Sequence, residues 1–239
     1  MKKLMLLFLT AFVSPHKVGR VNPPFEGVLH YQLSYKEKWF GTKGEVHTTI
    51  YEVPGKFRIE AYDTSYKDPE LTVQNPLLID VQKGTETHLL TRFQRAAVYS
   101  VSTKNQMVQK MESGTHTVYN VENLGKEMIN NFTCTHFRIS KSYEKLMTLK
   151  PAVYDIWITN DLGSGSIWYV GDYLYLYPGL DLFTKLSKAG ADGVVVEWQL
   201  KTKGVTTCML TTYQKMDLPD SIFSPPSGYS ASQVPGFNP

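Results

Sequence analysis

Short runs in which apolar and polar residues alternate recur along this chain, separated by turns that contain glycine or proline. In Gly27–Tyr35, every second residue from Leu29 onward is Leu or Tyr, and the residues between them are polar. A period of two residues places one face of a β-strand against a core and the other toward water. Pro54-Gly55 separates the runs Glu45–Val53 and Lys56–Tyr62 and is typical of a type II turn. Successive hairpins of this kind build an antiparallel sheet, so one mainly β domain is predicted.

The same alternation predicts strands along the rest of the chain. They are Leu77–Val81, Thr87–Phe93, Ala96–Ser102, Thr115–Val121, Thr133–Ser140, Val153–Thr159, Gly193–Leu200 and Val205–Tyr213. We expect the first two of these to pair as a hairpin, with Gly84 in the turn. The stretch Leu124–Gly163 contains two of these strands as a hairpin. We expect this hairpin to tie an N-terminal run of strands to a C-terminal run.

Helical patterns are few. Apolar residues recur at helical spacing in Leu180–Ala189, with Gly190 just past the end, and this pattern predicts a helix. Met107 and Met111 lie four residues apart, a spacing that suits a single helical turn.

Length, composition and charge narrow the functional classes. A chain of 239 residues, of which 42% are hydrophobic, is sufficient for one large β domain. Aromatic residues make up 13% of the chain, including 15 Tyr, and aromatic side chains favour strands and ligand clefts. The net charge is +3 with no basic run, which argues against a nucleic-acid surface built on phosphate neutralisation.

The N-terminal segment has the order of a secretory leader. Lys2 and Lys3 precede the apolar stretch Leu4–Val13, which is too short to span a bilayer, and no cysteine follows for a lipid anchor. We therefore expect a leader at residues 1–14, a linker at 15–26, the β domain at 27–230 and a flexible tail at 231–239. The predicted location is the periplasm or the cell surface, and a buried N-terminal strand or helical turn is the alternative.

The chain contains no catalytic or metal-binding motif that we recognise. Its six histidines lack metal-ligand spacing, and metalloprotease, nucleophile-elbow and phosphate-loop motifs are absent. Asp155 and Glu197 could form a carboxylate pair, but both are expected on the solvent side of strands. We therefore predict no catalytic residue, no metal and no cofactor, and we do not expect an enzyme.

Three motifs in the second half of the chain resemble a known family. They are a Gly125, Ile129, Cys134 strand pattern, Trp157 with Thr159, and a closing pattern of Leu218, Pro219, Phe223, Pro226, Gly228 and Tyr229. These motifs resemble a family of exported bacterial domains of unknown function, which is similar to the LolA and LolB lipoprotein-carrier superfamily. The resemblance implies a strongly curved antiparallel sheet, an incomplete barrel, with one or two short helices over its concave face. It also implies a lipid or a lipoprotein acyl chain as partner.

A curved sheet of this kind leaves an apolar concavity that must be filled by side chains or by a ligand. The candidate lining residues are Leu29, Tyr31, Leu33, Phe57, Ile59, Phe137, Ile139, Val194, Val196 and Trp198. Taken singly, each could be an ordinary core residue. Two functions therefore remain open, namely a carrier or binder of an apolar ligand, and an envelope interaction module with a filled core. In the second case the aromatic segment Tyr169–Tyr177 would contact a protein partner.

The two cysteines, Cys134 and Cys208, both lie in predicted strands. In an oxidising compartment they could form a disulfide that closes a long loop. Two buried free thiols are the alternative, because cysteine often serves as a small apolar core residue. The distance between the two strands decides between these alternatives.

Overall fold

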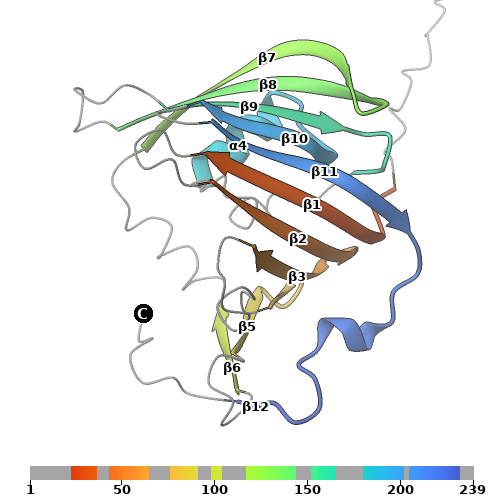
Figure 1. Ribbon diagram of the computed structural model, residues 1–239. Coiled ribbons are helices and arrows are strands. Elements are labelled where there is room, and N and C mark those ends of the chain that lie inside the picture. Colours follow the sequence, from red (N-terminus) through yellow and green to blue (C-terminus); the bar gives the residue numbers. More distant parts are fainter. Residues whose placement is uncertain are drawn as a thin grey trace, which may run out of the picture.

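The computed structural model describes residues 23–36, 43–64, 76–90, 98–103, 117–143, 152–164, 180–201 and 205–231 (Figure 1). The predicted leader, the Met107–Met111 turn, the aromatic segment Tyr169–Tyr177 and the end of the tail lie outside these residues. No helix among the described residues is long and apolar enough to cross a membrane.

The described chain is mainly β. The first half contains β1 (Gly27–Lys36), β2 (Lys43–Val53), β3 (Lys56–Asp63), β4 (Leu77–Asp80), β5 (Thr85–Leu90) and β6 (Val98–Thr103). The second half contains β7 (Thr117–Ile129), β8 (Phe132–Tyr143), β9 (Ala152–Thr159), α4 (Leu180–Lys188), β10 (Val194–Lys201), β11 (Val205–Lys215), a 3-10 turn η1 (Asp220–Phe223) and β12 (Ser230–Ala231).

All twelve strands form one sheet in the order β12-β6-β5-β4-β3-β2-β1-β11-β10-β9-β8-β7. Neighbouring strands are antiparallel except β12 and β6, which are parallel. Because β12 and β7 are the two edges, the sheet is not closed into a barrel. Strand direction turns from nearly horizontal at β7 to nearly vertical at β6 (Figure 1), as expected from the twist that accumulates between neighbouring strands.

The two halves of the chain join where β1 pairs with β11. Leu33 lies opposite Cys208, and the pairing runs from Gly27–Lys215 to Lys36–Val205. The predicted hairpin of Thr133–Ser140 and Val153–Thr159 is confirmed as β8 and β9, but it lies inside the second half. This hairpin does not join the two halves, because they are joined by the pairing of β1 with β11, two strands that lie far apart in the sequence.

Short turns set the strand register. Gly55 and Gly84 have positive φ angles of 83° and 62°, which glycine adopts without a steric penalty, and they connect β2 to β3 and β4 to β5 as predicted. Asn130 and Asn131 connect β7 to β8 with φ angles of 49° and 70°. Two consecutive positive φ angles define a type I′ hairpin turn. This strand continues to Ile129, beyond its predicted end at Val121, because the residues from Glu122 to Met128 are all exposed and do not alternate.

The predicted helix is confirmed as α4, which ends before Gly190, a residue with a φ angle of 84°. Leu182 and Leu186 pack into the hydrophobic core. The Lys185 Nζ donates to the Tyr119 carbonyl oxygen, and this bond holds α4 beside β7. This helix therefore packs at the β7 end of the sheet (Figure 1).

Contacts within the fold reach both ends of the described chain. Pro24 forms a bridge with Ser164, and Phe25 is only 1% exposed. At the other end, Ser230 and Ala231 pair with β6 as β12.

Candidate binding face

One face of the sheet, called the inner face here, carries the main hydrophobic core and receives the apolar side of α4. Nine of the ten predicted lining residues lie in this single cluster, and each is at most 4% exposed. They are Leu29, Tyr31, Leu33, Phe57, Ile59, Phe137, Ile139, Val194 and Trp198. The cluster extends over β1–β4 and β7–β11, so the fold brings together residues from both halves of the chain.

Val196 is the exception. The pairing of β10 with β9 shifts register between Val195 and Glu197, which is a β-bulge. As a result Val195 joins the inner cluster, whereas Val196 packs in a separate cluster with Cys134 and Trp157. The prediction that Val194, Val196 and Trp198 share one face is therefore wrong at Val196, because the bulge interrupts the alternation.

The inner side also buries polar groups that are not among the predicted lining residues. Thr48 and Glu52 are each 3% exposed and alternate along β2 with the core residues Val46 and Ile50. Thr48 and Glu52 follow Val46 at intervals of two residues, and this spacing could have predicted that both lie on the inner side. A buried carboxylate requires partners, and Glu52 has an interaction within the chain.

The Tyr31 hydroxyl is a second polar group on the inner side. It donates to the Val195 carbonyl oxygen at 2.9 Å. Burial raises the pKa of Tyr31 well above its usual range, and nearby Cys208 and Glu52 raise it further. The phenol is therefore a neutral hydrogen-bond donor at any physiological pH.

Cys134 and Cys208 are free, buried thiols. They belong to different clusters, and the strands that carry them, β8 and β11, are separated by β9 and β10. Three inter-strand spacings amount to about 14 Å, twice the limit of about 7 Å between Cα atoms that a disulfide can bridge. The structure thus shows free thiols and no Cys134–Cys208 disulfide, and burial raises the pKa of Cys134 to about 11 and of Cys208 to about 12.

The opposite face, called the outer face, carries a cluster of charged and aromatic side chains on β7, β8 and β9. The His136 Nδ1 lies 2.8 Å from the Glu127 Oε1, and its Nε2 lies 3.1 Å from the Asp155 Oδ1. The Arg138 Nε donates to the same Asp155 oxygen at 2.9 Å, which raises the pKa of Arg138. Trp157 donates its indole N–H to Glu127. These contacts tie the edge strand β7 to β8 and β9.

This cluster corrects one expectation from the sequence. Asp155 was expected on the solvent side, but it is 3% exposed and is bound by His136 and Arg138. Among the described residues, no group of three or more metal-ligating side chains could hold a metal ion.

The fold defines a mainly β protein with one open antiparallel sheet and an apolar inner face. The chain belongs to the family described as a domain of unknown function, DUF4412, whose model matches residues 25–229. The predicted membership in a family of unknown function is thus confirmed. Among curated proteins, none matches this sequence significantly.

Solved structures that are similar to this chain include a lipoprotein-sorting protein domain, a lipoprotein and PNGF-II. A putative outer membrane lipoprotein-sorting protein domain from Vibrio parahaemolyticus is 10% identical, with 82% of this chain and 88% of that chain covered and a TM-score of 0.36. The Mycobacterium tuberculosis lipoprotein LppX is 11% identical, with 79% and 86% covered and a TM-score of 0.32. PNGF-II is 15% identical over 85% of this chain, which spans 30% of the PNGF-II chain, with a TM-score of 0.41.

Proposed function

We propose that this protein is exported to the cell envelope and binds a lipid-like or other apolar ligand against the inner face of its sheet. The proposed role is binding without catalysis, and the proposed partner is a lipid or the acyl chain of a lipoprotein. The apolar leader-like stretch Leu4–Val13 supports the proposed export.

One observation carries the proposal. The inner cluster is continuous over nine strands, whereas the described residues supply a single nine-residue helix, α4, to cover it. Leu182 and Leu186 cover the part of the face near β7, far along the sheet from β3 and β4. An extended apolar face is stable in water only when chain or ligand covers it. The nine lining residues of the cluster are already buried without a ligand, so the proposed binding requires the inner face to open.

Native mass spectrometry of protein purified without detergent tests the proposal directly. We expect a mass above that of the polypeptide, and organic extraction should release acyl species. A fluorescent fatty acid added to delipidated protein should bind and be displaced by unlabelled fatty acid. Repeated preparations with a bare mass and no binding of the fluorescent fatty acid would overturn the proposal and favour the envelope interaction module.

A substitution at Ala61 tests whether the inner face opens for a ligand or is a filled core. Ala61 is a small side chain of the inner cluster on β3 and is 7% exposed. In a face that opens for a ligand, Ala61→Phe would occupy ligand space and weaken fatty-acid binding at little cost in stability. In a filled core, the same change would destabilise the fold by about 1–3 kcal/mol through overpacking. Met209→Phe on the outer side of β11 is the control, because Met209 is 37% exposed.

A further inference from the structure

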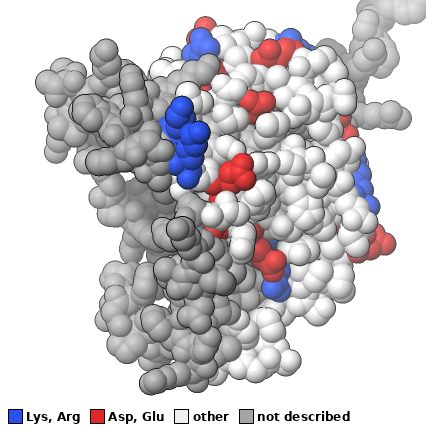
Figure 2. All heavy atoms as spheres, viewed as in Figure 1, with Lys and Arg blue, Asp and Glu red and all other residues white. Residues whose placement is uncertain are grey.

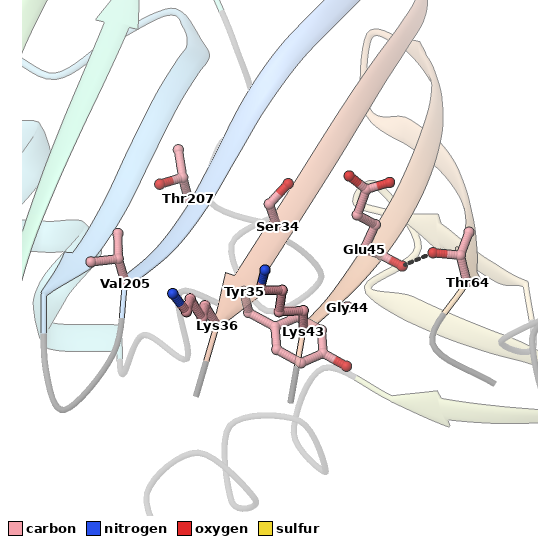
Figure 3. A pocket seen from close by; sticks show the side chains of 9 residues that line it. All are labelled: Ser34, Tyr35, Lys36, Lys43, Gly44, Glu45, Thr64, Val205 and Thr207. Atoms are coloured by element: carbon pink, nitrogen blue, oxygen red, sulfur yellow. Dashed lines mark hydrogen bonds between the residues drawn. The ribbon is translucent and has the colours of Figure 1, made fainter. Parts of the chain in front are cut away.

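A polar pocket lies at the rim of the sheet, where β1 ends, β2 begins and β11 begins (Figure 3). Its volume is about 510 Å³. Sites for small molecules commonly have volumes of roughly 300–1,000 Å³. The lining residues Ser34, Glu45 and Thr207 alternate with inner-face residues along their strands, so this part of the lining lies on the outer face. Tyr35, which also lines the pocket, packs against the apolar cluster.

Two lysines face each other in this pocket. Lys36 on β1 lies directly opposite Lys43 on β2, and both side chains reach into the pocket (Figure 3). Like charges placed directly opposite on neighbouring strands destabilise a sheet. Within the described part of the chain, neither lysine forms an ion pair with a carboxylate. An anion bound between the two ammonium groups would remove this repulsion.

Two hydroxyl groups lie next to the lysines. Ser34 is two residues before Lys36 on the same side of β1. Thr207 lies directly opposite Ser34 on β11. Two residues along a strand span about 7 Å, so the hydroxyl and ammonium donors reach the same space. Ammonium and hydroxyl donors on one side of a pocket match the oxygen atoms of a phosphate group.

Glu45, the acidic residue of the lining, contacts side chains other than the two lysines. The Glu45 Oε1 accepts a hydrogen bond from the Gln32 Nε2 at 2.9 Å, and its Oε2 lies 3.7 Å from the His47 Nε2. The Glu45 carbonyl oxygen accepts bonds from the backbone N–H and the hydroxyl of Thr64 at 2.9 and 3.1 Å. These contacts fix the Glu45 wall of the pocket and direct its carboxylate toward Gln32 and His47.

The wall formed by Tyr35 is held in place by the backbone of β2. Tyr35 lies opposite Gly44, and a Cβ atom built on Gly44 would lie 2.3 Å from the Tyr35 hydroxyl oxygen. The ring can therefore pack over β2 only because residue 44 has no side chain. This packing gives the pocket one rigid aromatic side.

We propose that this pocket binds the phosphate group of a phosphate ester. The ammonium groups of Lys36 and Lys43 and the hydroxyl groups of Ser34 and Thr207 are the donors. The ester is either a soluble metabolite or the head group of an anionic lipid, since both present the same phosphate oxygens. The proposal is independent of the apolar ligand proposed above, because the four donors occupy outer-face positions of their strands.

Two probes distinguish the two sources. Calorimetry with glycerol 3-phosphate measures binding of a soluble ester to the full chain. Cosedimentation with phosphatidylglycerol vesicles, compared with phosphatidylcholine vesicles, measures binding of the lipid head group. We expect the double variant Lys36→Gln with Lys43→Gln to bind the relevant probe about a hundredfold more weakly, since each charge-assisted bond contributes about a factor of ten.

The control variant carries Lys126→Gln and Lys215→Gln. It removes the same two positive charges from exposed strand positions outside the pocket, and it should bind like the unmodified protein. Retained fatty-acid binding and an unchanged melting temperature would show that the pocket variant is folded. The proposal is overturned if the unmodified protein binds neither probe. It is also overturned if both double variants lose binding affinity equally, because that result indicates attraction by net charge alone.

Discussion

The Tyr31 hydroxyl on β1 donates to the Val195 carbonyl oxygen on β10, across the strand β11 that separates them. The bulge between Val195 and Glu197 interrupts the regular pairing of β10 with β9 at this point. A buried carbonyl at an interrupted ladder needs a partner from a side chain. This single bond therefore supports the seam between the two halves of the chain.

Removing this hydroxyl should weaken the seam. We expect Tyr31→Phe to lower the free energy of unfolding by about 1–2 kcal/mol, because a buried acceptor loses its donor. Urea denaturation followed by circular dichroism measures the change. Tyr213→Phe is the matched control, since Tyr213 is 46% exposed, and its stability should stay within about 0.5 kcal/mol. Equal stability of the two variants would contradict the role given to Tyr31.

Asp155 should be the most sensitive member of the outer-face cluster. Asp155→Ala leaves His136 and Arg138 without their shared carboxylate, and we expect a loss of about 3 kcal/mol in the free energy of unfolding. Asp155→Asn should lose less, because the amide oxygen can still accept one bond. Asp217→Ala, at an exposed position after β11, serves as the control. A small effect of Asp155→Ala in the same denaturation assay would show that solvent replaces these contacts.

Cys208 should make stability depend on alkaline pH. Burial raises the pKa of its thiol to about 12 from the ordinary value of 9.0. The folded state thus holds the proton more tightly than the unfolded state, and the stabilisation present below pH 9 is lost as the pH rises toward 12. Between pH 8 and pH 10 the loss from this one group is about 1.4 kcal/mol.

Comparison with Cys208→Ala isolates this effect from the titration of other groups. Urea denaturation at pH 8, 9 and 10 should show a steeper loss of stability for the unmodified protein than for the variant. Parallel pH profiles would mean that the thiol stays accessible to water in the folded state.

The turn between β7 and β8 should respond to glycine and alanine in opposite directions. Asn131 has a φ angle of 70°, which costs a residue with an ordinary side chain about 1–2 kcal/mol. We expect Asn131→Ala to lower the melting temperature and Asn131→Gly to preserve or raise it, because Asn-Gly is favoured in type I′ turns. Asn120→Ala, on the exposed side of β7, is the control and should be nearly neutral. A destabilised glycine variant would argue against a type I′ turn here.

The parts of the fold that were predicted are those encoded by neighbouring residues. Pro54-Gly55 and Gly84 marked hairpins, and the apolar spacing before Gly190 marked α4, because turns and helices depend on local φ and ψ preferences. The exposed part of β7 was missed because a strand without a buried side has no alternation. The separate position of Val196 was missed because a bulge leaves no signal in the hydrophobic pattern.

The sequence alone determined that this chain forms antiparallel hairpins and which side chains they bury, because alternation along a strand is a local property of the backbone. Only the tertiary structure decided that Tyr31 lies beside Leu210, that Asp155 is buried under His136 and Arg138, and that Lys36 meets Lys43 at a polar pocket. Pairing of strands as distant as β1 and β11 depends on the packing of the whole sheet, since no short segment contains both partners.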